Sequence, residues 1–143
     1  QQRASTYGRT LKFGYRVHVV VRETEDEARS AAAHLISAVD AATGDAIRSR
    51  SLDSTSVGVR RQAELRESAG NDGFVEPHLW TGIGKARSGC GAAIVGTPQQ
   101  VIDKIHRYEA MGIEAFIFSG YPHKDEAERF ADLVLPHLNH GPL

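Results

Sequence analysis

Residues 11–22 read LKFGYRVHVVVR, and together with the TEDE that follows at 24–27 this stretch decides the fold class. Its β-branched and aromatic residues end where charged residues begin, which predicts a strand. Thr24 can cap a helix, Glu27 can complete a capping box, and apolar residues then recur at helical spacing as far as Val39. The stretch therefore predicts a strand followed by an amphipathic helix.

Two further units repeat this pattern. One has the apolar run AAIV at 92–95, and then a helix that TPQQ at 97–100 begins and Gly112 ends. The other has the apolar run 113–118, the break SGYP at 119–122, and a last amphipathic helix. Strands that are apolar throughout and alternate with amphipathic helices are typical of parallel sheets covered by helices. The sequence therefore predicts an α/β fold.

The predicted sheet is incomplete, and one connection is long. Three parallel strands leave two unpaired edges, which natural folds pair, cover or close. We therefore expect further chain or self-association into a homo-oligomer to complete the fold. Residues 43–91 far exceed the usual connection of about 2–6 residues, so we interpret them as an inserted mobile loop. Within this insertion, 54–68 has a weak helical pattern.

Composition excludes several classes of protein. The chain has 143 residues, enough for one domain, and 17 Lys+Arg against 18 Asp+Glu leave a net charge of -1. Such a charge provides no field for nucleic acid or an anionic membrane, and no apolar run is long enough to span one. The single cysteine, Cys90, fits a reducing compartment, so we expect a cytoplasmic protein. The seven histidines lack metal-ligand spacing, so we predict no metal site.

Two polar residues in the first strand are candidates for chemistry. Side chains alternate along a strand, so Arg16 and His18 share one face. Buried charge is costly unless it is paired, which indicates that this face lines a polar cavity. The alternative is that Arg16 binds backbone carbonyls or a carboxylate at a sheet edge.

Three more candidates follow later in the chain. Tyr121 and His123 come directly after the third strand, where parallel α/β folds build their sites, although this turn could also simply end the strand and His123 could cap the helix. Arg87 lies in a glycine-rich segment, TGIGKARSGCG at 81–91. A loop arginine can bind a sulfonate, phosphate or carboxylate in a bidentate manner, or it can be an ordinary solvated cation.

Three stretches taken together resemble the flavin-dependent alkanesulfonate monooxygenases of the bacterial luciferase-like superfamily. They are FGYRVHVVVRET at 13–24, LWTGIG at 79–84 running into Arg87, and FIFSGYPH at 116–123. The similarity covers nearly the whole chain, 1–143, as one segment that corresponds to the C-terminal part of a full-length member. It implies a partial (β/α)₈ TIM barrel with about three of the eight β/α units.

The resemblance also implies a reaction and roles for the candidates. Members use reduced FMN and O₂ to cleave the carbon–sulfur bond of an alkanesulfonate, which yields an aldehyde and sulfite. A separate NAD(P)H-dependent flavin reductase supplies the reduced FMN. By resemblance Arg16, His18 and Tyr121 are catalytic, whereas Arg87 and His123 bind substrate. Negative charge develops on oxygen in such a step, and fixed cationic donors stabilise it.

Other functions stay open at this stage. The family's earlier strands provide much of the flavin surface, so we expect this segment alone to be inactive unless self-association completes it. A second hypothesis is a non-catalytic α/β association module that uses exposed sheet edges. A third is a luciferase-like oxidoreductase acting on an aldehyde, an alkane or a deazaflavin-linked substrate. Arg16 together with Arg87 favours an oxyanionic substrate over that third hypothesis.

Overall fold

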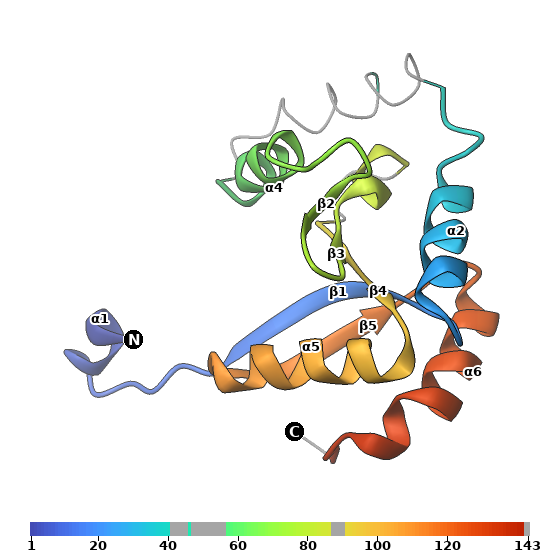
Figure 1. Cartoon of the computed structure of the whole chain (residues 1–143). Helices are drawn as coiled ribbons and strands as arrows, with labels where there is room; N and C mark the ends of the chain where they lie inside the picture. Colours follow the sequence, from blue (N-terminus) through green and yellow to red (C-terminus); the bar gives the residue numbers. More distant parts are fainter. Residues whose placement is uncertain (41–45, 47–56, 87–90, 142–143) are drawn as a thin grey trace.

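The computed structural model describes residues 1–40, 46, 57–86 and 91–141 (Figure 1). Its elements, in chain order, are α1 (Gln2–Ser5), β1 (Phe13–Val21), α2 (Glu25–Leu35), α4 (Val57–Glu67), β2 (Phe74–Glu76), β3 (Leu79–Trp80), the 3₁₀ turn η1 (Gly82–Lys85), β4 (Ala93–Gly96), α5 (Pro98–Ala110), β5 (Ile113–Ser119), α6 (His123–Leu133) and the 3₁₀ turn η2 (Leu135–His137). The three predicted strand–helix units, β1–α2, β4–α5 and β5–α6, are therefore confirmed. No helix in these ranges is long and apolar enough to cross a membrane.

The strands form one mixed sheet in the order β2-β3-β4-β1-β5. β1 runs parallel to both β4 and β5, with His18 opposite Ala93 on one side and Ser119 on the other. β2 and β3 form an antiparallel pair, and β3 continues the sheet antiparallel to β4. The parallel part of the α/β prediction thus lies in the centre and at one edge of the sheet.

Local capping explains where the helices begin and end. The Thr24 hydroxyl accepts from the Glu27 backbone N–H at 3.3 Å, and Glu27 accepts from the Thr24 backbone N–H at 3.1 Å. Thr97 and Gln100 form the same reciprocal pair at the start of α5. Gly112 follows α5 with φ +95°, a conformation in which a glycine ends a helix without a Cβ clash. The predicted capping boxes and helix end are confirmed.

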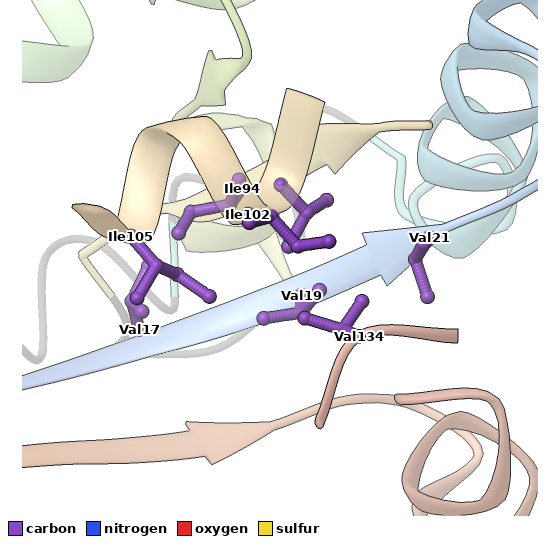
Figure 2. Packing of buried hydrophobic residues seen from close by; sticks show 8 residues of the cluster. Val17, Val19, Val21, Ile94, Ile102, Ile105 and Val134 are labelled. Carbon is purple, nitrogen blue, oxygen red and sulfur yellow. The ribbon is translucent and has the colours of Figure 1, made fainter. Parts of the chain in front are cut away.

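Helices cover both faces of the sheet. The odd residues of β1, Val17, Val19 and Val21, pack with residues of α5 and with Val134 in one core cluster (Figure 2). On the opposite face, Val20 packs with α2 residues and with Trp80 in a second cluster. α2 and α6 both lie near the carboxyl end of β1 and on different sides of it (Figure 1).

The strand order differs from a continuous arc of a barrel. In such an arc β4 would lie between β1 and β5, and all helices would lie on the outer face. Here β3 pairs with the edge of β4 that is not bound to β1, and β5 pairs with the other edge of β1. The predicted partial barrel is therefore seen only as a mixed α/β sheet.

The insertion contributes a helix and two strands. The weak helical pattern at 54–68 is confirmed as α4, and 74–80 form the β2–β3 hairpin, which we did not predict. Trp80 anchors the hairpin, since it is 3% exposed and its indole N–H donates to the Asp72 carbonyl at 3.1 Å. Short strands of two or three residues give little periodicity in sequence, which explains why the hairpin was missed.

Candidate active site

The carboxyl ends of β1 and β5 meet where the strand order reverses. The chain leaves β1 for β4 on one side, and β5 returns to the other side of β1. The helices that follow β1 and β5 lie on opposite faces of the sheet. In open parallel sheets such a switch point leaves a crevice at the carboxyl ends of the strands, where ligands bind. The topology therefore locates a candidate site at His18, Ser119 and the turn that follows.

Three of the predicted site residues come together there as a series of rings. His18 is 4% exposed, and its ring stacks on Tyr121 with centroids 5.3 Å apart and planes at 21°. Tyr121 in turn contacts His123, with centroids 4.6 Å apart and planes at 42°. The Tyr121–Pro122 peptide bond is cis. Residues from opposite ends of the chain thus form one imidazole–phenol–imidazole cluster.

The His123 ring is hydrogen-bonded to the turn that precedes α6. It is the first residue of α6, and its Nδ1 lies 2.7 Å from the Gly120 carbonyl oxygen. A carbonyl only accepts, so Nδ1 carries the proton and donates it. Acid–base exchange at this ring consequently uses Nε2.

A cavity of about 340 Å³ lies between the sheet and α6, and His123 is the residue of the cluster that lines it. It is lined by Val19, Phe118, Ser119, Gly120, His123, Glu126, Ala127, Phe130, Ala131 and Leu135. Most of this lining is apolar, and the polar groups gather at the end where β5 gives way to α6. The Ser119 hydroxyl is buried without a hydrogen-bond partner, and its register partner on β1 is His18. The cavity could therefore accept an apolar group with a polar end toward the turn.

Arg16 shares the face of His18 but does not join the ring cluster. It is exposed, and its register neighbour on β5, Ile117, is 63% exposed. α2 packs against this face near Val20, so it leaves the amino-terminal half of β1 uncovered. Arg16 and His18 therefore do not share the predicted polar cavity, because Arg16 is exposed and His18 is buried against Tyr121. Arg87 and Cys90 lie outside the described residues.

The structure adds two residues that the sequence did not single out. Arg22 Nη2 and Nη1 lie 2.7 and 3.1 Å from the two carboxylate oxygens of Glu126. Glu126 is 5% exposed and follows His123 by three residues in the first turn of α6. An acidic residue in the first turn of a helix is common, so no signal in the sequence distinguished Glu126. Its partner, Arg22, is 104 positions away in the sequence.

Gly120 allows the turn to approach α6 closely. A Cβ at this position would lie 2.5 Å from the Glu126 Cβ and 3.2 Å from the Val19 carbonyl oxygen. Such distances exclude any larger residue unless the helix shifts. The turn that carries Tyr121 and His123 therefore packs directly on Glu126.

The residues present favour proton transfer and hydrogen bonding over metal chemistry. Two imidazoles and a phenol can donate or accept hydrogen bonds, and they can polarise an oxygen atom. Within the part of the chain that the structure describes, no group of three His, Cys, Asp or Glu side chains could hold a metal ion.

Comparison with known proteins gives the family. Residues 1–115 match the model of the family described as luciferase-like monooxygenase. A sulfoquinovose monooxygenase of Novosphingobium aromaticivorans is 68% identical over 141 residues, which cover 99% of this chain and 39% of the relative. One of Agrobacterium fabrum is 58% identical over 137 residues, which cover 96% and 36%.

The chain thus spans less than two fifths of the length of these relatives. Their names specify sulfoquinovose, so the comparisons support the expected family without supporting an alkanesulfonate as the substrate. The family match covers well over half of the chain and agrees with the mixed α/β sheet. The chain belongs to the luciferase-like monooxygenase family.

Proposed function

We propose that this chain forms part of the active site of a flavin-dependent monooxygenase that cleaves the carbon–sulfur bond of a sulfonated sugar. The observation that carries the proposal is the stack of buried His18 on Tyr121 at the carboxyl edge of the parallel strands. Similarity to two sulfoquinovose monooxygenases over nearly the whole chain supports it.

The names of the relatives and the charge of the sulfonate group indicate the substrate class. Sulfoquinovose is a sugar sulfonate, and its anionic group requires a cation or several hydrogen-bond donors. Arg16 lies two residues before His18 on the same face of β1 and is exposed to incoming ligand. We assign Arg16 to the sulfonate, and by resemblance Arg87 to the same group.

The cluster fits one wall of a site for reduced FMN. The imidazole nitrogens and the phenol can hydrogen-bond to the carbonyl and nitrogen atoms of a flavin ring, and the stacked rings offer a flat surface. When bound, reduced FMN would supply two electrons to O₂, so that one oxygen atom enters the organic product and the other forms water.

The residues of this chain would then stabilise negative charge and transfer protons. Sulfite leaves with the electron pair of the carbon–sulfur bond, and the carbon becomes a carbonyl. Arg16 stabilises the negative charge on the departing group, while His18 and Tyr121 donate or hold a proton at the reacting oxygen. His123 exchanges a proton through Nε2, because its Nδ1 proton is bound by the Gly120 carbonyl.

Further partners are part of the same proposal. A separate NAD(P)H-dependent reductase would supply the reduced FMN, and the exposed face around Ile117 would be covered by the remaining strands of a barrel or by a second copy of the chain. Light scattering on the chain tests self-association: a homo-oligomer is expected, and a monodisperse monomer would contradict it.

Sulfite release tests the function. A protein that carries this chain at the full length of its relatives is mixed with reduced FMN, O₂ and one of three substrates: sulfoquinovose, octanesulfonate or decanal. We expect sulfite from sulfoquinovose, and a loss of about 10²–10⁴-fold in the His18→Ala and Arg16→Ala variants. Lys12→Ala is the control, because Lys12 is exposed and lies 3.8 Å from Glu114 at the surface.

The three substrates separate the hypotheses. Sulfite from octanesulfonate alone would restore the alkanesulfonate expectation, and oxidation of decanal without sulfite would identify another luciferase-like activity. Absence of turnover with all three substrates would leave the non-catalytic module.

A further inference from the structure

A buried ion pair joins the end of β1 to the first turn of α6. Arg22 immediately follows β1, and its guanidinium binds both carboxylate oxygens of Glu126 at 2.7 and 3.1 Å. The Glu126 side chain is 4% exposed, and that of Arg22 is 21% exposed. A bidentate pair fixes orientation as well as distance. The pair therefore sets where α6 begins relative to β1.

The same carboxylate residue is in direct contact with the turn of the candidate site. Its backbone N–H donates to the Pro122 carbonyl at 3.1 Å, which closes the first turn of α6. Its Cβ lies where the side chain of any residue larger than glycine at 120 would have to go. Glu126 therefore cannot move toward Gly120 without displacing the turn that carries Tyr121 and His123.

We propose that Arg22 and Glu126 are positioning residues that hold Tyr121 and His123 against His18. The ion pair acts on the rings through the turn, because the Arg22 guanidinium binds the Glu126 carboxylate and Glu126 packs on Gly120. The inference rests on the proposed function for its catalytic meaning. The ring contact itself can be measured without activity.

A second ion pair, with a buried lysine and a 39% exposed carboxylate, provides a control. Lys104, on α5, is 5% exposed, and its Nζ lies 2.7 Å from Glu76 on β2 and 2.8 Å from the Pro77 carbonyl oxygen. This pair joins a helix to the sheet as Arg22 and Glu126 do, but at the β2–β3 hairpin. Breaking either pair should destabilise the fold, since a buried charge loses its partner. Only a positioning pair should also move the rings.

The experiment compares Glu126→Gln and Arg22→Lys with Glu76→Gln in the whole 143-residue chain. Nuclear Overhauser cross-peaks between the His18 and Tyr121 ring protons report the contact, and urea unfolding of the same samples reports stability. We expect Glu126→Gln to lose the cross-peaks and Glu76→Gln to keep them while unfolding at lower urea. Arg22→Lys keeps the positive charge but cannot form the two parallel hydrogen bonds of a guanidinium, so the ring cross-peaks of this variant should weaken.

These outcomes decide the inference. A folded Glu126→Gln or Arg22→Lys protein with unchanged ring cross-peaks would overturn it, and so would loss of the cross-peaks in Glu76→Gln. If Glu126→Gln does not fold, Arg22→Lys decides by itself.

Activity gives a separate readout in a full-length protein. A ring displaced by about 1 Å should lower kcat for sulfite release by about 10²-fold, with a smaller change in KM, and Glu76→Gln should keep the kcat of the unmodified protein. If the unmodified protein releases no sulfite, the proposed function fails while the cross-peaks still decide whether the pair positions the rings. If sulfite is released and the cross-peaks do not respond, only the positioning role fails.

Discussion

His18 and Tyr121 come from the first and last strand–helix units of the chain, yet their rings stack with centroids 5.3 Å apart. The contact exists because β1 and β5 are adjacent and in register, with His18 opposite Ser119, so that the turn after β5 reaches the ring on β1. This pairing connects the order of the strands to the composition of the candidate site.

Two substitutions of Tyr121 test the contributions of its ring and of its hydroxyl to stability separately. Tyr121→Ala should lower the free energy of unfolding by about 1–3 kcal/mol, since it removes a half-buried ring and its stacking on His18. Tyr121→Phe keeps the stack and should stay within about 1 kcal/mol of the unmodified chain. Urea unfolding measures both. Tyr7→Ala is the control, because Tyr7 is 74% exposed and should be neutral; equal losses at the two tyrosines would argue against the stack.

The core under α5 should be sensitive to truncation. Ile105 is 1% exposed and packs on the β1 valines (Figure 2), so Ile105→Ala should cost about 2–5 kcal/mol through lost burial and the cavity left behind. Met111→Ala removes an apolar side chain that is 73% exposed, and it should change stability by less than about 0.5 kcal/mol. Chemical denaturation of the two variants checks this, and similar losses would mean that α5 does not bury this face.

Close packing at Gly120 predicts a steric cost. Gly120→Ala places a Cβ 2.5 Å from the Glu126 Cβ, so the variant should lose about 1–3 kcal/mol and shift the Tyr121 ring signals. Gly141→Ala is the matched control, since nothing lies within 4 Å of its Cβ position. Unfolding and one-dimensional spectra of the aromatic protons test this prediction. Unchanged stability in Gly120→Ala would show that the turn does not pack on α6.

The start of α2 should respond to acid. Hydrogen bonds from Arg29 and then Gln100 hold the pKa of Glu25 below its usual value of 4.5. The folded state thus favours the carboxylate, and its contribution to stability is present above pH 4.5 and is lost as the pH falls through the lower folded pKa. The side chain is 37% exposed, so solvent screens the effect.

Urea midpoints measured between pH 7 and pH 3 test this dependence. The unmodified chain should lose more stability over that range than Glu25→Gln does. Glu114→Gln is the control, because its carboxylate is exposed and lies 3.8 Å from Lys12. A Glu25→Gln curve parallel to that of the unmodified chain would show that the carboxylate of Glu25 is not held by Arg29 and Gln100.

Local patterns were sufficient for most of the elements. Thr24 with Glu27 and Thr97 with Gln100 cap helices through contacts three residues apart, so the sequence alone determined where α2 and α5 begin. The apolar spacing of Val101, Ile102 and Ile105 likewise determined the buried face of α5. The positions of His18, Tyr121 and His123 near strand ends followed from the same local information.

Tertiary structure decided what these elements lie next to. The β2–β3 hairpin pairs with one edge of β4, and β5 pairs with β1, so the strand order joins segments that are distant in the chain. The same pairing stacks Tyr121 on His18, leaves Arg16 exposed, and brings Arg22 to Glu126. Capping and amphipathic spacing act over one or two turns of chain and are visible in sequence, whereas strand order and buried ion pairs arise only when distant segments pack.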